Sequence, residues 1–243
     1  MSEATVLESR QGRALLLRLN RPRALNALST PLLDELRTLL ELGRSDPDVA
    51  VVILASSEAR AFSAGMDVKE TVAEGGRNSR RLLDFQWFLE TYEKPLIASL
   101  RGHVSGGGAE LALSADIRVG DETTRFRFPA SGYGIVQGTW HLIDVVGASW
   151  AKQLVLTGRE VAAEEALRLG LLHELVADPD ARAVELADQL ASRSQTSLLE
   201  MKALFARAAG RTLKERFDAE YERNLDLSQR PEVVAAMRRL LER

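Results

Sequence analysis

Two glycine-containing loops constrain this chain most, because each lies between a short apolar run and a predicted helix. The first loop covers residues 62–67 (FSAGMD) and the second covers residues 106–110 (GGGAE). Backbone N–H groups supplied by two such loops can stabilise the oxyanion that develops on a thioester carbonyl. Glu110 follows the last glycine of the second loop by two residues. We therefore predict a site at these loops, with Glu110 as the best candidate for a catalytic side chain.

Strands and helices alternate along the first part of the chain. Apolar runs at 14–19, 49–55 and 96–100 predict short buried strands. Between the first two runs, Thr30 is the expected N-cap of a helix and Pro31 its first helical residue. Such alternation is typical of an α/β fold with mostly parallel strands.

The sequence from about Ala148 onward predicts helices almost throughout. Amphipathic patterns cover 181–193, 197–209, 213–227 and 231–243. We place a boundary near residue 195, with a core over 1–195 that holds the site. Residues 196–243 form a predicted helical module that packs on the core or mediates trimer assembly.

Composition and charge argue against several classes of protein. The 243 residues carry a net charge of −3, with a pI of about 5.8, so no basic footprint for nucleic acid or an anionic membrane is present. The chain has no cysteine, which excludes disulfides, thiolate catalysis and zinc–cysteine sites. His173 begins a near-match to the HExxH zinc motif that fails at Ala177, so we predict no metal site. Without a signal-peptide pattern or a long apolar run, we expect a soluble cytoplasmic protein.

The glycine run of the second loop does not fit two common motifs. Residues 102–108 cannot be written as GxGxxG, the dinucleotide-binding fingerprint. In residues 102–106 (GHVSG) the serine is fourth, whereas the nucleophile elbow of serine hydrolases has it third. A glutamate near a helix N-terminus can also serve only to stabilise the helix dipole. The close spacing of Glu110 to three glycines is what favours a catalytic role.

Several segments of the chain resemble the crotonase superfamily, also called the enoyl-CoA hydratase/isomerase family. The matching segments follow the family's order and spacing and are 20–28, 61–70, 94–98, 102–116, 156–158 and 163–171. The resemblance implies a spiral of repeated ββα units, with C-terminal helices that support trimers or hexamers. It also implies an acyl-CoA substrate, in which coenzyme A is part of the substrate and no separate cofactor is needed.

The resemblance also implies roles for individual residues. The backbone N–H groups of Met66 and Gly107 would be the oxyanion donors, and Glu110 matches the first of the hydratases' two catalytic glutamates. Arg23 would lie near the CoA phosphates and Val68 would line the pantetheine path, while Ala24 and Ala64 would border the adenine. The expected substrate- and CoA-binding residues are Arg23, Ala24, Ala64, Asp67, Val68, Gly106, Ala130, Tyr133 and Trp140.

One position departs from the family pattern. The second glutamate normally follows a proline downstream of the first, and the residue after Pro129 here is Ala130. A methyl group can neither orient a water molecule nor transfer a proton. The reaction therefore stays open between double-bond isomerisation by Glu110 alone and a slow hydration. Tyr133, Gln137 and His141 are candidates for the missing second group.

Two other functions stay open on the sequence. The same oxyanion hole would serve an acyl-CoA decarboxylase or hydrolase, and a chain that had lost the chemistry would be a non-catalytic acyl-CoA-binding paralogue. RNA binding lacks support, because no basic stripe with interleaved aromatic residues is present.

Overall fold

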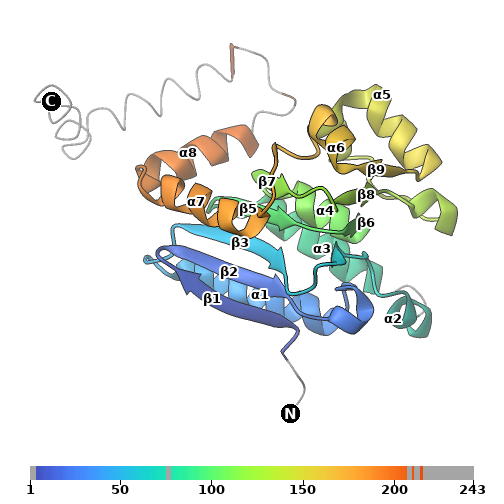
Figure 1. Ribbon diagram of the computed structural model, residues 1–243, viewed down its shortest axis with the longest axis horizontal. Coiled ribbons are helices and arrows are strands. Elements are labelled where there is room, and N and C mark those ends of the chain that lie inside the picture. The colour runs from blue at the N-terminus through green and yellow to red at the C-terminus, as the bar shows by residue number, and fades with distance from the viewer. Residues whose placement is uncertain (1–3, 75–77, 207–209, 211–213, 216–243) are drawn as a thin grey trace, which may run out of the picture. The chain divides into compact units, whose positions relative to one another are not determined.

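The computed structural model describes residues 4–74, 78–206, 210 and 214–215 (Figure 1). The chain divides into two compact units, Met1–Ser192 and Arg193–Arg243. In the second unit, helix α8 (Gln195–Ala206) corresponds to the predicted helix at 197–209. The helices predicted at 213–227 and 231–243 lie outside the described residues.

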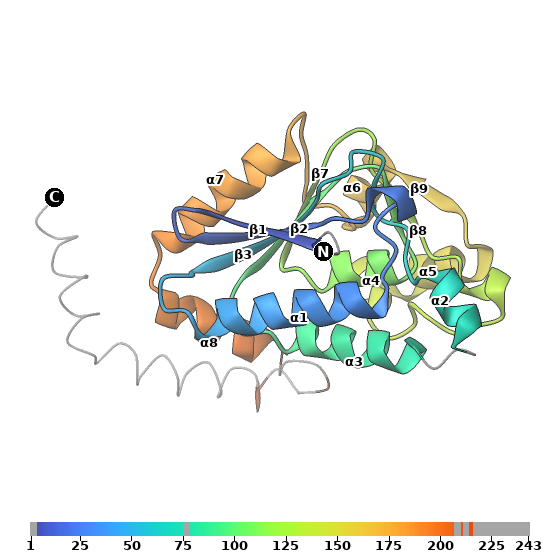
Figure 2. The same cartoon turned by 90° about the horizontal axis from the view of Figure 1, so that it is seen from below.

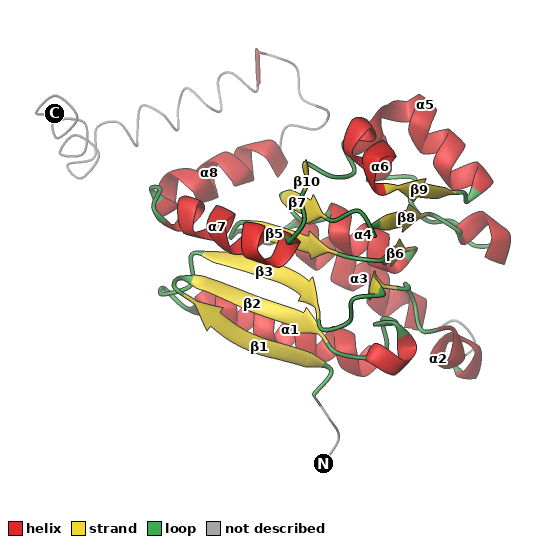
Figure 3. Ribbon diagram, in the orientation of Figure 1, coloured by secondary structure: helices red, strands yellow, loops and turns green. Residues whose placement is uncertain are grey.

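The strands of the first unit form two sheets (Figure 3). The larger sheet has the order β1-β2-β3-β5-β7-β10, and the smaller has the order β4-β6-β8-β9. The strands of the larger sheet are β1 (Val6–Gln11), β2 (Ala14–Leu19), β3 (Val51–Ser56), β5 (Leu96–Leu100), β7 (Ile117–Gly120) and β10 (Glu174–Leu175). Those of the smaller sheet are β4 (Ala61–Ser63), β6 (His103–Ser105), β8 (Arg125–Arg127) and β9 (Glu160–Ala162). All pairs are parallel except β1 with β2 and β8 with β9.

From β3 to β8, successive strands alternate between the two sheets, and a helical segment follows each such pair. Strands β3 and β4 precede α2 (Val68–Ala73) and α3 (Asn78–Glu90), while β5 and β6 precede α4 (Gly107–Leu113). Strands β7 and β8 precede the 3₁₀ helix η2 (Ala130–Tyr133) and α5 (Leu142–Thr157). This is the repeated ββα arrangement, and the predicted α/β class is confirmed.

Helices cover both faces of the larger sheet (Figure 2). Helix α1 (Thr30–Ser45) lies on one face beside α3, and α7 (Pro179–Ala191) lies on the other. Leu32, Leu36 and Leu40 recur every four residues and bury one stripe of α1 in the main core. On the opposite face, α7 packs the small side chains of Ala183 and Ala187 against the sheet.

The start of α1 differs from the prediction. The cap position is Ser29 rather than Thr30, and the Ser29 side chain makes no capping hydrogen bond. The Thr30 N–H donates instead to the carboxylate of Glu70 in α2, with Oε2 at 2.8 Å. A carboxylate distant in sequence thus replaces the local cap, and no local pattern could have revealed it.

The prediction that the chain is almost wholly helical beyond Ala148 is also wrong in part. Strands β9 and β10 interrupt that region, between α5, α6 (Ala163–Leu169) and α7. Strand β1 was not predicted either, because all but one of its residues are exposed and its sequence shows no apolar run. The short 3₁₀ helix η1 (Pro22–Ala24) completes the elements near the N-terminus. No helix in the described part of the chain has the length and apolar character needed to cross a membrane.

Candidate active site

The two glycine loops begin at the same edge of the smaller sheet. Strands β4, β6 and β8 are neighbours and run parallel, so their carboxyl ends meet at one edge. The 62–67 loop continues from β4, the 106–110 loop continues from β6, and the segment with Ala130 follows β8. The carboxyl ends of parallel strands are where α/β sheets commonly bind ligands.

The Met66 amide points away from the segment beside it. Leu28 and Met66 form an isolated parallel bridge, in which the Leu28 N–H donates to Gly65 O at 2.7 Å and the Asp67 N–H donates to Leu28 O at 3.2 Å. In such a bridge, the residue between the two bonded positions directs its own N–H to the opposite side. Among the described residues, neither the Met66 N–H nor the Gly107 N–H has a hydrogen-bond acceptor.

Gly65 brings the two loops into contact. Its φ of 95° is in the left-handed region. A Cβ at this position would lie 2.8 Å from Ser105 O and 3.3 Å from Gly107 N, so only glycine fits. The structure therefore places the residue before Met66 directly against the amide of Gly107.

Gly108 fixes the second loop against β4. A Cβ on Gly108 would lie 2.6 Å from Ser63 Cβ and 2.7 Å from Ser63 O, closer than any side chain could come. On the other side, the Gly106 N–H donates to Arg127 O in β8 at 2.9 Å. The glycine run thus allows α4 to begin between two strands of the smaller sheet.

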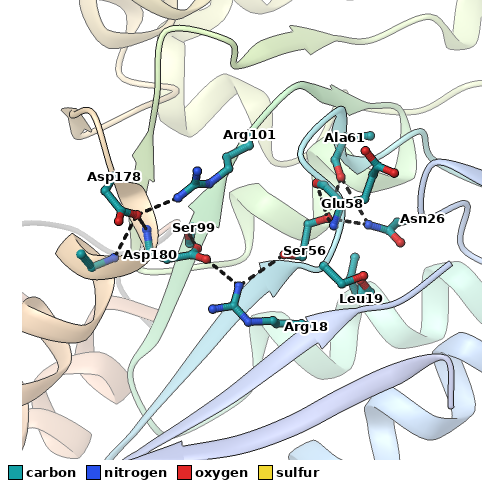
Figure 4. A network of polar contacts seen from close by, with 12 residues as sticks. Arg18, Leu19, Asn26, Ser56, Glu58, Ala61, Ser99, Arg101, Asp178 and Asp180 are labelled. Atoms are coloured by element: carbon teal, nitrogen blue, oxygen red, sulfur yellow. Dashed lines mark hydrogen bonds and ion pairs between the residues drawn. The ribbon is translucent and has the colours of Figure 1, made fainter. Parts of the chain in front are cut away.

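Asn26 ties the preceding segment to the first loop (Figure 4). Its buried amide nitrogen donates to Ser56 Oγ at 2.7 Å and to Phe62 O at 3.1 Å. The Ser63 hydroxyl donates back to Asn26 O at 2.8 Å. These bonds set the position of the 20–28 segment relative to β4, a role that the sequence motif did not reveal.

Glu110 is completely buried and its carboxyl group has no protein partner. The side chain is 0% exposed, and neither oxygen has a hydrogen-bond partner among the described residues. A Cβ on Gly138 would lie 3.4 Å from Glu110 Oε1, with Val155 and Phe128 also beside that glycine. The pKa of Glu110 is raised to about 7, first by burial and second by the negative charge of Glu90. A carboxyl group with such a pKa can both donate and accept a proton near neutral pH.

His141 is a second buried titratable group on the same side of the molecule. Its Nε2 lies 3.6 Å from Glu90 Oε2, longer than a hydrogen bond, and its ring stacks on Trp140 with centroids 4.7 Å apart. The pKa of His141 is lowered to about 4, first by burial and second by the positive charge of Arg118, with a smaller opposing effect of Asp144. His141 is therefore neutral at neutral pH, and its contact with Glu90 is not an ion pair.

The residues predicted to hold the CoA moiety gather around the first loop. Arg23 and Ala24 lie in η1, and the Ala64 N–H donates to Leu25 O at 2.9 Å, so these segments are neighbours. Arg23 and Ala64 are exposed, and Val68, at the start of α2, is 66% exposed. Their contact with CoA stays a prediction.

Asp67 already has protein partners for its carboxylate. It caps α2 by accepting from the N–H groups of Lys69 at 3.1 Å and Glu70 at 3.2 Å. It also pairs with Arg21 at 2.9 Å. Partial burial acts to raise the pKa of Asp67, but these hydrogen bonds outweigh it and the pKa is lowered. The arrangement gives Asp67 a structural role in the first loop beside its predicted binding role.

The predicted site residues in the segment after β8 differ from one another in burial. Ala130 is buried, whereas Tyr133 is 71% exposed. Gln137 borders the second loop, since a Cβ on Gly106 would lie 3.8 Å from Gln137 Oε1. Gly138, which no motif singled out, lies beside the Glu110 carboxyl group.

Gln86 is a buried polar residue that sequence reasoning missed. It lies in α3, is 2% exposed, and neither its Nε2 nor its Oε1 has a hydrogen-bond partner in the described structure. The available signal was its spacing: Gln86 stands four residues after Leu82 and three before Leu89, at a position where this helix would otherwise bury an apolar side chain. No group of three His, Asp or Glu side chains in the described part of the chain is arranged to hold a metal ion.

The chain is similar to several known proteins along most of its length. It matches the family model described as Enoyl-CoA hydratase/isomerase over residues 9–243. It is 38% identical over 234 residues to a probable enoyl-CoA hydratase of Rhizobium meliloti, covering 93% of this chain and 89% of that protein. It is 40% identical over 201 residues to the 2,3-dehydroadipyl-CoA hydratase of Escherichia coli, covering 79% of this chain and 76% of that protein. The crystal structure of enoyl-CoA hydratase from Bacillus anthracis superposes with a TM-score of 0.93 at 26% identity, covering 98% of this chain and 96% of that one.

Proposed function

The chain belongs to the enoyl-CoA hydratase/isomerase family, and on that premise we propose that it is an enzyme acting on an enoyl-CoA thioester. In this proposal the N–H groups of Met66 and Gly107 stabilise the negative charge that develops on the thioester oxygen. Glu110 transfers the proton at the neighbouring carbon. Support comes from the contact between the two loops at Gly65 and from the two amides having no acceptor among the described residues.

The observation that carries the proposal is the buried carboxyl group of Glu110, which has no hydrogen-bond partner in the described part of the chain. A carboxyl group without a partner in the protein interior destabilises the fold, so its presence is best explained by use in the reaction. Glu110 lies one helical turn after Gly107, so the same short helix supplies a proposed oxyanion donor and the acid/base group. Its pKa of about 7 suits proton transfer in both directions at neutral pH.

Ala130 limits which reaction we expect to be fast. In isomerisation, Glu110 takes a proton from C2 of a 3-enoyl-CoA and returns it to C4, so one carboxyl group suffices. In hydration, water must also be held at C3, and losing an acid/base partner costs roughly 10²–10⁴-fold in rate. We therefore expect isomerase activity, or hydratase activity with a different group holding the water.

The test is a panel of 2-enoyl, 3-enoyl and malonyl-type CoA esters, with products identified by mass spectrometry. Glu110→Gln removes the proton transfer and should lower turnover of the active substrate by roughly 10²–10⁴-fold. Glu164→Gln is the matched control, because Glu164 is an exposed acid in the first turn of another seven-residue helix. Equal turnover by wild type and Glu110→Gln on every substrate would remove Glu110 from the mechanism.

A second candidate function follows from Ala130 alone. A chain that keeps the pocket without the second glutamate could bind acyl-CoA without turning it over. Calorimetry showing tight acyl-CoA binding, with no product from any member of the panel, would favour this function. Product from the malonyl-type esters alone would instead favour decarboxylation or thioester hydrolysis at the same oxyanion hole.

We also expect the chain to assemble as a trimer or hexamer. Large apolar side chains are exposed along residues 133–156 of the single chain, which is consistent with a covered surface: Tyr133, Ile135, Val136, Trp140, Ile143, Trp150 and Leu156. Light scattering on the purified protein measures the assembly directly.

A further inference from the structure

Helix α3 presents one stripe of side chains to α4. Leu82, Gln86 and Glu90 are spaced by four residues, so they share one face of the helix. At one end of this stripe, a Cβ on Gly107 would lie 2.9 Å from Leu82 Cδ2. At the other end, the charge of Glu90 acts on Glu110. Gln86 lies between them, so its side chain faces the first turn of α4.

Several buried polar groups of α3, α4 and the start of α5 lack a hydrogen-bond partner among the described residues. Both polar atoms of the Gln86 amide, both carboxyl oxygens of Glu110 and the Nδ1 of His141 are buried, without a hydrogen-bond partner among the described residues. Buried polar groups in folded proteins are nearly always hydrogen-bonded. Gln86 and Glu110 do not bond to each other or to any other described residue, so these side chains are available to bond a polar group of a ligand or of a water molecule.

The chemistry of Gln86 indicates what that group is. An amide offers two N–H donors and one carbonyl acceptor, and it stays neutral at all working pH values. A hydroxyl oxygen both donates and accepts, so it can bond to the carbonyl and the N–H of an amide. A hydrocarbon chain can do neither, and a carboxylate can only accept.

Resting on the proposed function, we infer that Gln86 is a hydrogen-bonding residue of the acyl pocket, which holds an O–H group opposite Glu110. That group is either the water that adds to the double bond or a hydroxyl carried by the acyl chain. In the first case, the oxygen of water bonds to C3 and protonated Glu110 gives its proton to C2. The proton released by water then returns to the Glu110 carboxylate. Gln86 exchanges no proton and acts as a positioning residue, in the role that Ala130 cannot fill.

The experiment compares wild type with Gln86→Leu, which keeps the approximate size of the side chain and removes both polar functions. Gln189→Leu in α7 is the matched control, because Gln189 is exposed on a helix of the opposite layer. Both variants are measured with crotonyl-CoA, which carries no polar substituent, and with a 2-enoyl-CoA that bears a hydroxyl on its acyl chain. Circular dichroism verifies that the variants fold. If Gln86→Leu does not fold, Gln86→Met replaces it in the same measurements.

Two results support the inference and distinguish the sources of the O–H group. If Gln86 holds water, kcat for crotonyl-CoA falls by about tenfold or more while KM is unchanged, and Glu110-dependent hydrogen–deuterium exchange at C2 of a 3-enoyl-CoA, which needs no addition of water, continues. If Gln86 binds an acyl hydroxyl, KM rises by about tenfold or more for the hydroxylated substrate alone. Changes below about tenfold in both parameters for both substrates would overturn the inference.

Failure of the proposed function gives a different result. Wild type would then turn over no enoyl-CoA, whatever the residue at position 86. Calorimetry with 3-hydroxybutanoyl-CoA still tests Gln86 in that case, because this ligand carries its hydroxyl at C3. Gln86→Leu should weaken binding by about tenfold or more, and unchanged affinity overturns the inference independently of turnover.

Discussion

Two polar regions of the first unit differ in how their groups are satisfied. In the network around Asp180, Arg18 donates to Asp180 Oδ2 at 2.6 Å and to Ser56 O at 3.3 Å, and the Ser99 hydroxyl donates to Asp180 Oδ1 (Figure 4). Around Glu110, by contrast, the buried polar atoms have no hydrogen-bond partner among the residues that the structure describes. The polar groups around Asp180 are hydrogen-bonded to one another, whereas those around Glu110 are available to bond a ligand.

The difference separates groups that stabilise the fold from groups available for chemistry. A satisfied network joins α7 to the larger sheet and extends through Ser56 to Asn26, so it also positions the first glycine loop. An unsatisfied buried carboxyl group lowers stability, and active sites are where such groups are commonly found. Substitutions in the two regions should therefore affect stability in opposite directions.

The largest predicted effect on stability is a gain from Glu110→Gln at alkaline pH. The folded-state pKa of Glu110, about 7, exceeds the ordinary value of 4.5. A raised carboxyl pKa means that stability is highest below about pH 4.5 and falls as the pH rises toward 7. We expect Glu110→Gln to match wild type near pH 4.5 and to exceed it by roughly 3 kcal/mol at pH 8 in urea unfolding.

Glu174→Gln provides the opposite control for that measurement. A hydrogen bond from Arg182 lowers the pKa of Glu174, so its contribution to stability is present above the ordinary glutamate pKa and lost in acid. Glu174→Gln should therefore be slightly less stable than wild type at pH 8. If Glu110→Gln is also less stable than wild type at pH 8, the Glu110 carboxylate does not destabilise the fold and the contrast with the Asp180 network is wrong.

Gly108→Ala should disrupt the site by moving one loop relative to the other. The added Cβ would lie 2.6 Å from Ser63 Cβ and 2.7 Å from Ser63 O, so β4 and α4 must separate. We expect kcat/KM to fall by roughly 10²-fold, because loop displacement misplaces the proposed oxyanion donors. Overpacking should also cost about 1–3 kcal/mol of stability.

The control for this substitution is Gly132→Ala, since a Cβ there would meet nothing within 4 Å. Kinetics and urea unfolding of the two variants are compared side by side. If Gly108→Ala is as active as Gly132→Ala, close contact between α4 and β4 is not needed for the reaction.

The smallest effect is expected from Asp180→Asn. This substitution weakens the bonds to Arg18 and Ser99 at a partly buried site, so it should lower the free energy of unfolding by about 1–2 kcal/mol. Turnover by the folded protein should be unchanged, because Asn26 still bonds to Ser56 and Phe62 beside the first glycine loop and the network contains none of the proposed catalytic groups. A tenfold fall in kcat without loss of stability would show that the Asp180 network acts on the reaction directly.

Much of the fold near the site could be predicted because it depends on local patterns. The strands at 14–19 and 96–100 have the predicted bounds, and the 106–110 loop does open a helix as expected. The cap of α1 could not be predicted, because Glu70 supplies it from another helix. Strands as short as β9 and β10 contain too few residues for a pattern to distinguish them from their surroundings.

The candidate site was predictable only in part, for a related reason. The spacing of Glu110 to the glycines is a local feature and identifies it from sequence. The roles of Gln86 and Gly138 depend on which elements they face, and those elements are distant in the sequence. A glutamine in a helix usually points to solvent, so only the packing of α3 on α4 shows that this one is buried without a partner.

By itself, the sequence determined the alternation of strands and helices, the two glycine loops and the carboxyl group that follows them. These depend on side-chain periodicity and on the conformations that glycine allows, which act over a few residues. Only the tertiary structure decided that Gly65 lies against Gly107 and that Gly138 lies beside Glu110. The raised pKa of Glu110 also depends on the tertiary structure. Contact and burial depend on elements far apart in the chain, and both the proton affinity of a carboxyl group and the need of an amide for a partner follow from that environment.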